Sequence, residues 1–270
     1  MCKIINRFFI FLAALMLLCG CASATQPSPE SGSRKEIDQA LTRWRELSDT
    51  SIKWLSDDGW IRVEDSPEQG DNTGMTYLQH TSWYQIADKK VVRGMAVATD
   101  PISGEDSQIF IIDQDQYRSD LIELRQKGKD AYQYAFPEKI DWGVEKVSNA
   151  ALDYKNIETF KEAITNIRIE EKDNAVKFTV EYFGEPMSGK MQFYYPAMDM
   201  TGRIETYTYD TEHGNLLASE DFYVYKDGTK KQLVNMAISI EKFETVPDDV
   251  LERIELLEEE NAYYRKVFEK

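Results

Sequence analysis

The sequence predicts an α+β fold that is mainly β, an open antiparallel half-barrel of strands wrapped on helices, with a further helix at the C-terminus. Three observations predict it. Short runs rich in Val, Ile, Phe and Tyr are separated by turn-forming residues. Helical periodicities lie near both ends of the chain. The strand pattern of the first half recurs in the second. With 270 residues, including 15 Tyr and 12 Phe, the chain can bury a substantial core.

The first 20 residues have the pattern of an export signal. Lys3 and Arg7 precede an apolar run from Phe8 to Leu18, which is shorter than the roughly 20 residues of a spanning helix. Leu18-Cys19-Gly20-Cys21 resembles the bacterial lipobox, in which the last cysteine receives a lipid and becomes the new N-terminus. The resemblance implies a lipoprotein signal peptide over residues 1–20 and lipidation of Cys21. The alternative is an ordinary secretory signal that contains cysteines.

The composition of the mature chain restricts its chemistry and its partners. No cysteine follows Cys21, so disulfides, thiolate metal sites and catalytic thiols are excluded. Loss of residues 1–20 removes two of 32 basic residues and none of 48 acidic ones, which leaves a formal charge of −18. This charge argues against nucleic acid and against electrostatic docking on anionic lipid. The lipobox resemblance implies a location in the cell envelope, lipid-anchored to the outer face of the cytoplasmic membrane or to the outer membrane.

Residues 21–33 are small, polar and proline-containing, which is typical of a flexible tether. The main domain is expected over residues 34–249, and it opens with a helix from Arg34 to about Leu55. The apolar residues of this segment follow helical spacing: they are Ile37, Leu41, Trp44, Leu47 and Leu55. Gly59 is expected to end the helix as its C′ residue.

Two strand meanders are expected to form the sheet. Strand patterns lie at 60–64, 83–86, 91–99 and 108–113, and "DPISGED" before the last of them has turn chemistry. The segment 60–113 can be aligned with 175–227, which indicates an internal duplication; the alternative is that any two hairpins look alike. Asp227-Gly228 predicts a tight hairpin after the repeat.

Two further helices are predicted. One follows Asn156, with Ile157, Phe160 and Ile164 on its apolar side, whereas the aromatic segment around Pro137 is interpreted as a loop or edge strand. The other is an amphipathic C-terminal helix over 250–270, which Asp248 or Asp249 can cap. Its apolar seam carries Val250, Ile254, Leu257, Asn261, Tyr264 and Phe268. The seam either pairs with a partner protein in a coiled coil or packs on the chain's own sheet, and its length of under three heptads favours the latter.

Reaction motifs are absent from the sequence, so we nominate no catalytic residue, cofactor or metal ligand and expect no enzyme. The histidines, His80 and His213, lie outside zinc-type patterns, and no nucleotide-binding or nucleophile-elbow motif occurs. Neighbouring carboxylates are expected by chance among 48 acidic residues. These pairs are Asp57 with Asp58, Glu105 with Asp106, and Asp113 with Asp115; the serines before glycine are Ser31, Ser103 and Ser188.

The aromatic residues of "MQFYYP", "YTYD" and "DFYVYK" occupy both faces of their strands, so one face must meet a second core, an interface or an apolar pocket. Together with the lipobox, tether, helix, meanders and the ending "VPDDV", this order resembles the lipoprotein-carrier and glycolipid-binding lipoprotein fold (LolA/LppX-like). The resemblance implies an open barrel that binds a lipid or other hydrophobic ligand. It provides no ligand-contacting residue. The alternative is a protein-interaction or sensory module that regulates an envelope complex or membrane regulator.

Overall fold

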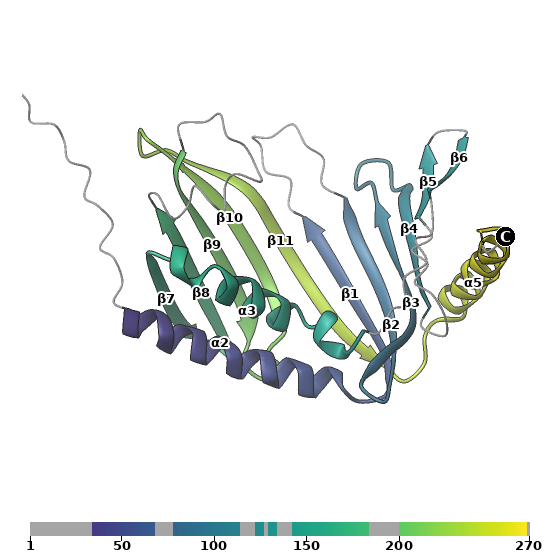
Figure 1. Ribbon diagram of the computed structural model, residues 1–270, viewed down its shortest axis with the longest axis horizontal. Helices are drawn as coiled ribbons and strands as arrows, with labels where there is room; N and C mark the ends of the chain where they lie inside the picture. The colour runs from purple at the N-terminus through teal and green to yellow at the C-terminus, as the bar shows by residue number, and fades with distance from the viewer. Residues whose placement is uncertain are drawn as a thin grey trace, which may run out of the picture. The chain divides into compact units, whose positions relative to one another are not determined.

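The computed structural model describes residues 34–67, 78–113, 122–126, 129–133, 142–183 and 200–268. Cys21 and the segments 1–20 and 21–33 lie outside the described residues. Within them the chain forms one antiparallel sheet of 11 strands, with helices packed on both of its faces (Figure 1).

The elements follow one another along the chain with these bounds. In the first half they are α2 (Arg34–Leu55), β1 (Gly59–Pro67), β2 (Gln79–Ala87), β3 (Lys90–Thr99), β4 (Asp106–Asp113), β5 (Ile122–Gln126) and β6 (Lys129–Gln133). In the second half they are η1 (Val144–Lys146), α3 (Asn149–Thr159), η2 (Lys161–Ala163), β7 (Asn166–Lys172), β8 (Ala175–Phe183), β9 (Met200–Asp210), β10 (Leu216–Tyr225), β11 (Lys230–Phe243) and α5 (Asp248–Phe268).

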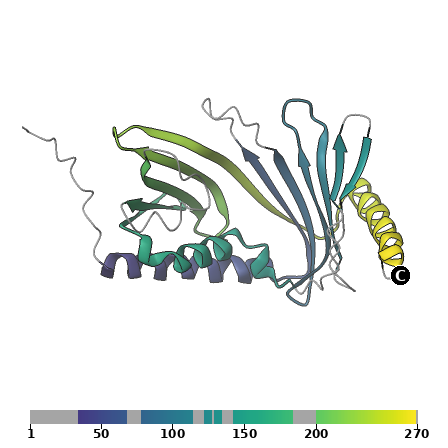
Figure 2. The ribbon, with the colours of Figure 1, turned by 45° about the horizontal axis from the view of Figure 1, so that its top comes forward.

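The strand order confirms the predicted open, mainly β fold. It runs β6-β5-β4-β3-β2-β1-β11-β10-β9-β8-β7, so two meanders meet where β1 pairs with β11. The end strands β6 and β7 do not pair with each other, and the sheet therefore stays open. Figure 2 shows the strands β7 to β11 curving over α2 and α3, and we call the face that these helices cover the inner face.

Helix α2 has the bounds that its periodicity predicts, and all five predicted apolar positions are buried. The expected role of Gly59 was wrong, because α2 ends at Leu55 and Gly59 instead begins β1 with φ +141°. A Cβ atom at Gly59 would lie 3.0 Å from the carbonyl oxygen of Phe243 on β11. Glycine is therefore required for the close approach of two strands and for its positive φ.

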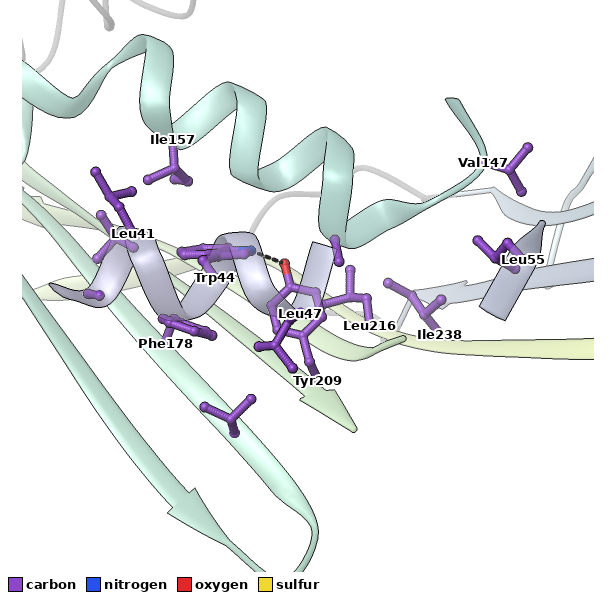
Figure 3. Packing of buried hydrophobic residues seen from close by; sticks show 14 of the residues in the cluster. Leu41, Trp44, Leu47, Leu55, Val147, Ile157, Phe178, Tyr209, Leu216 and Ile238 are labelled. Atoms are coloured by element: carbon purple, nitrogen blue, oxygen red, sulfur yellow. Dashed lines mark hydrogen bonds between the residues drawn. The ribbon is translucent and has the colours of Figure 1, made fainter. Parts of the chain in front are cut away.

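The main core fills the space between the helices and the inner face of β8 to β11 (Figure 3). Trp44 of α2 is fully buried and stacks on Phe178 of β8, with 4.3 Å between ring centroids. Its indole N–H donates a hydrogen bond to the hydroxyl oxygen of Tyr209 on β9 at 3.1 Å. Each side chain of this size contributes roughly 2–3 kcal/mol of hydrophobic stabilisation when it is buried. This part of the inner face is thus a filled core.

Helix α3 begins earlier than the sequence predicts. Ser148 is its N-cap, and the side-chain oxygen of Ser148 accepts a hydrogen bond from the Ala151 N–H. The expected start after Asn156 was wrong, because Asn156 lies inside α3 and Phe160 is the C-cap. Ile157 is nevertheless buried, as its apolar pattern requires. The N-cap fixes the start of α3, because Ser148 accepts a hydrogen bond from a backbone N–H that has no partner within the helix.

Two hairpins share the turn chemistry that the proposed duplication predicts. In the β3–β4 turn the Asp100 side chain accepts from the Ile102 N–H, and in the β9–β10 turn the Asp210 side chain accepts from the His213 N–H. The glycine four residues after each aspartate has a φ of +70° or +69°. However, β8 pairs directly with β9, whereas β2 lies between β1 and β3. Residues 192–196 lie outside the described residues, and the duplication stays a prediction.

Helix α5 packs on the opposite, outer face of the sheet. Ile254 and Leu257 are 0% and 5% exposed, and they contact an apolar cluster formed by Trp60, Trp83, Met95 and Val97. The packing of the seam on the chain's own sheet is therefore confirmed for its first half. The side chains of Asn261, Tyr264 and Phe268 lie outside the described part. No described helix is both long enough and apolar enough to span a bilayer.

Candidate functional site

The inner face changes from apolar to charged along strand β9. Alternate residues of a strand point to the same face, so Arg203, Glu205 and Tyr207 share the inner face with Tyr209. Tyr209 lies in the core beneath α2, whereas Arg203 lies six residues nearer to the start of the strand. The charged end of this row therefore lies beyond the core residues that α2 covers.

Five inner-face side chains of β8, β9 and β10 form one hydrogen-bonded group, which we call the polar cluster: Tyr182, Arg203, Glu205, Tyr207 and Asp221. The Arg203 guanidinium donates to both carboxylate oxygens of Asp221, at 2.8 and 2.5 Å, and lies 3.0 Å from Glu205 Oε1. The hydroxyl groups of Tyr182 and Tyr207 donate to Glu205 Oε2 at 3.1 and 3.2 Å. The Glu205 side chain is only 3% exposed. Three neighbouring strands are thus joined by charges that have little contact with water.

The charge state of the polar cluster follows from its burial. Burial raises the pKa of the Tyr182 hydroxyl, and the negative charge of Glu205 raises it further. The same two causes raise the pKa of Tyr207. Both phenols therefore stay protonated and donate to the Glu205 carboxylate. Within the cluster itself, two carboxyl groups are set against one guanidinium.

A second polar group lies on the inner face of β1 and β2. Asp65 and His80 are directly opposite each other, and Ser82 follows on the same face as His80. Burial raises the pKa of the Asp65 carboxyl, and the nearby His80 lowers it. His80 is exposed, so this histidine lies at the surface and not in a closed site.

Partly buried apolar side chains pack against the main core on the same inner face. We call them the inner strip: Tyr84 of β2, Tyr207 of β9, and Met236 and Ile240 of β11. Tyr207, Ser219 and Met236 are opposite one another on β9, β10 and β11, which places Tyr207 and Met236 on one row. The strip therefore connects the apolar core with the polar cluster. Apolar side chains next to a few polar groups are the combination found in sites for ligands that have an apolar body and a polar end.

The fold does not bring together the remaining histidine, carboxylates and serines that the sequence pattern pointed to. His213 lies in the β9–β10 turn against the Trp54 ring, with 4.8 Å between ring centroids. Asp57 forms an ion pair with Lys242 at 2.9 Å, and Asp106 forms one with Arg253 of α5 at 2.6 Å. Three others lie in exposed turns: Asp58, Ser103 and Glu105. Ser31, Asp115 and Ser188 lie outside the described residues, as does the side chain of Asp113. Among the described residues, no three His, Cys, Asp or Glu side chains are placed to hold a metal ion.

Sequence reasoning missed the polar cluster, although the sequence contains a signal for it. In "RIETYTYD" two opposite charges occupy the same alternation as two tyrosines, so a face that buries the tyrosines must also receive Arg203 and Glu205. Asp221, the partner of Arg203, lies 18 residues further along the chain. Its position on the neighbouring strand follows only from the pairing register.

Comparisons with known proteins give a likeness of structure only. No family model matches the sequence, and no curated protein does. A solved structure of the Mycobacterium tuberculosis lipoprotein LppX is 12% identical with a TM-score of 0.38, and the match covers 78% of this chain and 98% of that chain. A LolA superfamily protein from Nitrosomonas europaea is 9% identical with a TM-score of 0.26, covering 76% and 96%. The Pseudomonas aeruginosa MucA/MucB complex is 13% identical with a TM-score of 0.41, covering 77% and 59%.

Proposed function

We propose that this protein is an extracytoplasmic lipoprotein, anchored through a lipid on Cys21, that binds a lipid or other hydrophobic ligand on the inner face of its sheet. The observation that carries the proposal is the inner strip, which leads from the closed core to the buried polar cluster. The proposed activity is binding and not catalysis.

The inner strip supports an apolar contact with the ligand. Tyr84, Tyr207, Met236 and Ile240 are only partly buried, although they pack on the main core. Covering the remaining apolar area would stabilise a complex by roughly 25 cal/mol per Å². The side chains come from three strands that the sheet holds in fixed register, so the surface is preformed.

The polar cluster supports recognition of a polar end. A buried ion pair rarely stabilises a fold more than apolar residues of the same size would, because both charges lose their hydration. Arg203, Glu205 and Asp221 are 18%, 3% and 14% exposed, so they carry this cost. A functional use of their charges accounts for their presence beside an apolar strip.

The lipobox supports a location of the protein at a membrane surface. A lipid on Cys21 would hold the domain at a membrane surface through the tether of residues 21–33. A ligand with an acyl chain would then be taken up next to the bilayer that contains it.

A titration with a fluorescent fatty acid tests ligand binding. The Met236→Arg variant places a charge on the inner strip and should weaken binding at least about tenfold, because the charge would be desolvated by the ligand. Ala237→Arg is the matched control, because Ala237 is exposed on the outer face of the same strand. Unchanged affinity in Met236→Arg, or no saturable binding by the wild-type protein, would overturn the proposed site.

Detergent phase separation tests the anchor independently of ligand binding. The exported wild-type protein should enter the detergent phase, and a Cys21→Ser variant should enter the aqueous phase, because only the former carries acyl chains. Mass spectrometry of the N-terminal peptide should find the lipid on Cys21. A free thiol at this position would remove the anchor from the proposal.

A further inference from the structure

Helix α3 borders the proposed site, and one acidic side chain connects it to the sheet. The Tyr209 hydroxyl donates a hydrogen bond to Asp153 Oδ2 at 2.7 Å, and the same hydroxyl oxygen accepts from the Trp44 N–H at 3.1 Å. Tyr209 and Trp44 are fully buried. A carboxyl group of α3 is therefore placed against the aromatic centre of the core.

We propose that Asp153 is a pH-sensitive latch that regulates the same inner-face site. Its protonated carboxyl group holds α3 on the sheet, and its ionisation loosens the helix and uncovers apolar surface beside the inner strip. The ligand part of this inference rests on the proposed function, whereas the movement of α3 does not.

The neighbours of Asp153 favour its neutral form. From β9 the titratable groups that face it are Tyr209, Tyr207 and Glu205, of which only Glu205 is charged. Burial raises the pKa of the Asp153 carboxyl to about 7, the hydrogen bond from Tyr209 opposes this, and the Glu205 charge adds to it. An ionised Asp153 would thus be desolvated and repelled by a second carboxylate.

The other packing partners of α3 supply no compensating positive charge to Asp153. From α2, the uncharged Trp44 is linked to Asp153 through Tyr209, whose hydroxyl group accepts from the Trp44 N–H and donates to Asp153. Arg45 of α2 instead contacts Tyr154 and lies 3.3 Å from Glu158 Oε1. Within the polar cluster, Arg203 is engaged by Asp221 and Glu205.

The direction of the pH effect follows from proton linkage. The pKa of Asp153 is raised on folding, so its contribution to the closed state is complete below about pH 4 and is lost as the pH rises to about 7. Between these limits the open form of α3 gains up to about tenfold in population for each pH unit. Above about pH 7 the carboxyl is ionised in both forms, and the population should level off.

Hydrogen exchange on the exported, full-length mature protein tests the latch. The exchange rates of peptides covering residues 149–159, divided by the intrinsic rates at each pH, give the equilibrium constant for opening of α3. This constant should rise about tenfold per pH unit from pH 5 to 7 and should then stay level. Asp153→Asn keeps an oxygen acceptor for Tyr209 and should abolish the slope. Asp38→Asn on the exposed side of α2 is the control and should retain it. A flat wild-type profile, or a slope that persists in Asp153→Asn, would overturn the latch.

Glu205→Gln provides a second variant that shifts the effect without removing Asp153. Loss of the neighbouring charge should lower the pH at which the opening of α3 levels off, and an unchanged or higher value would contradict the inference.

Titration with the fluorescent fatty acid at pH 5 and 7.5 separates the two proposals. A slope in α3 opening without ligand binding at either pH would remove the proposed function and leave the latch. Ligand binding that is equal at both pH values, together with α3 opening that does not change with pH, would remove the latch and leave the proposed function.

Discussion

Arg93 of β3 and Glu258 of α5 are joined by two parallel hydrogen bonds across the outer face of the sheet. The Nε and terminal nitrogens of Arg93 donate to the two carboxylate oxygens of Glu258 at 2.9 and 2.6 Å. Both side chains are partly buried, at 25% and 29% exposure. The pair therefore fixes the rotation of α5 above the apolar cluster on which the helix lies.

Removing this ion pair should loosen α5. We expect Glu258→Gln to destabilise the docked helix by about 1 kcal/mol, because a bidentate, partly buried pair is stronger than a surface pair. Hydrogen exchange of residues 248–258 would measure the change as roughly fivefold faster opening. Glu255→Gln, at an exposed position one residue after Ile254, should leave the exchange unchanged. Equal effects of the two variants would contradict the assigned role of Glu258.

Truncation of two nearby apolar residues of α5 should have very different effects on stability. Ile254 is fully buried against the outer face, so Ile254→Ala should lower the free energy of unfolding by about 2–4 kcal/mol. Leu256 is 56% exposed, and Leu256→Ala should change it by less than about 0.5 kcal/mol. Urea unfolding of the two variants measures both values. A small effect at Ile254 would mean that α5 does not dock on its own sheet in solution.

The two equivalent hairpin glycines should differ in their tolerance of a side chain. Gly104 and Gly214 both have a φ near +70°, so replacement by alanine should cost about 1–2 kcal/mol at either position. At Gly214 the added Cβ would also lie 2.3 Å from the carbonyl oxygen of Leu47 on α2, whereas Gly104 faces open space. Thermal unfolding should therefore show a larger loss of stability for Gly214→Ala. Equal losses would show that α2 does not approach this turn closely.

Trp44 should be the most sensitive position of the main core. Trp44→Ala removes the stack on Phe178 and should destabilise the protein by about 3–5 kcal/mol. Trp44→Phe keeps an aromatic ring but loses the N–H that donates to Tyr209, so we expect a smaller loss of about 1–3 kcal/mol. Urea unfolding followed by near-ultraviolet circular dichroism measures both losses. The reverse order of the two variants would contradict the packing described for Trp44.

Several elements could be predicted from the sequence because their causes are local. Helix α2 begins and ends where its apolar spacing predicts, and the Asp227-Gly228 turn joins β10 and β11 as expected. Strands β1 to β4 and β8 to β10 also lie on the predicted segments. In each case a few consecutive residues carry both the periodicity and the turn chemistry.

The sequence by itself determined the classes of the helices and strands, the antiparallel sheet and the side of α5 that is apolar, since each follows from the spacing of neighbouring residues. Only the tertiary structure decided that Asp221 reaches Arg203 and that Asp153 meets Tyr209, 56 residues away. Such contacts depend on strand register and helix placement, which the whole core settles together by burying its apolar side chains. The candidate site lies among these distant contacts, and no short segment of the chain contains it.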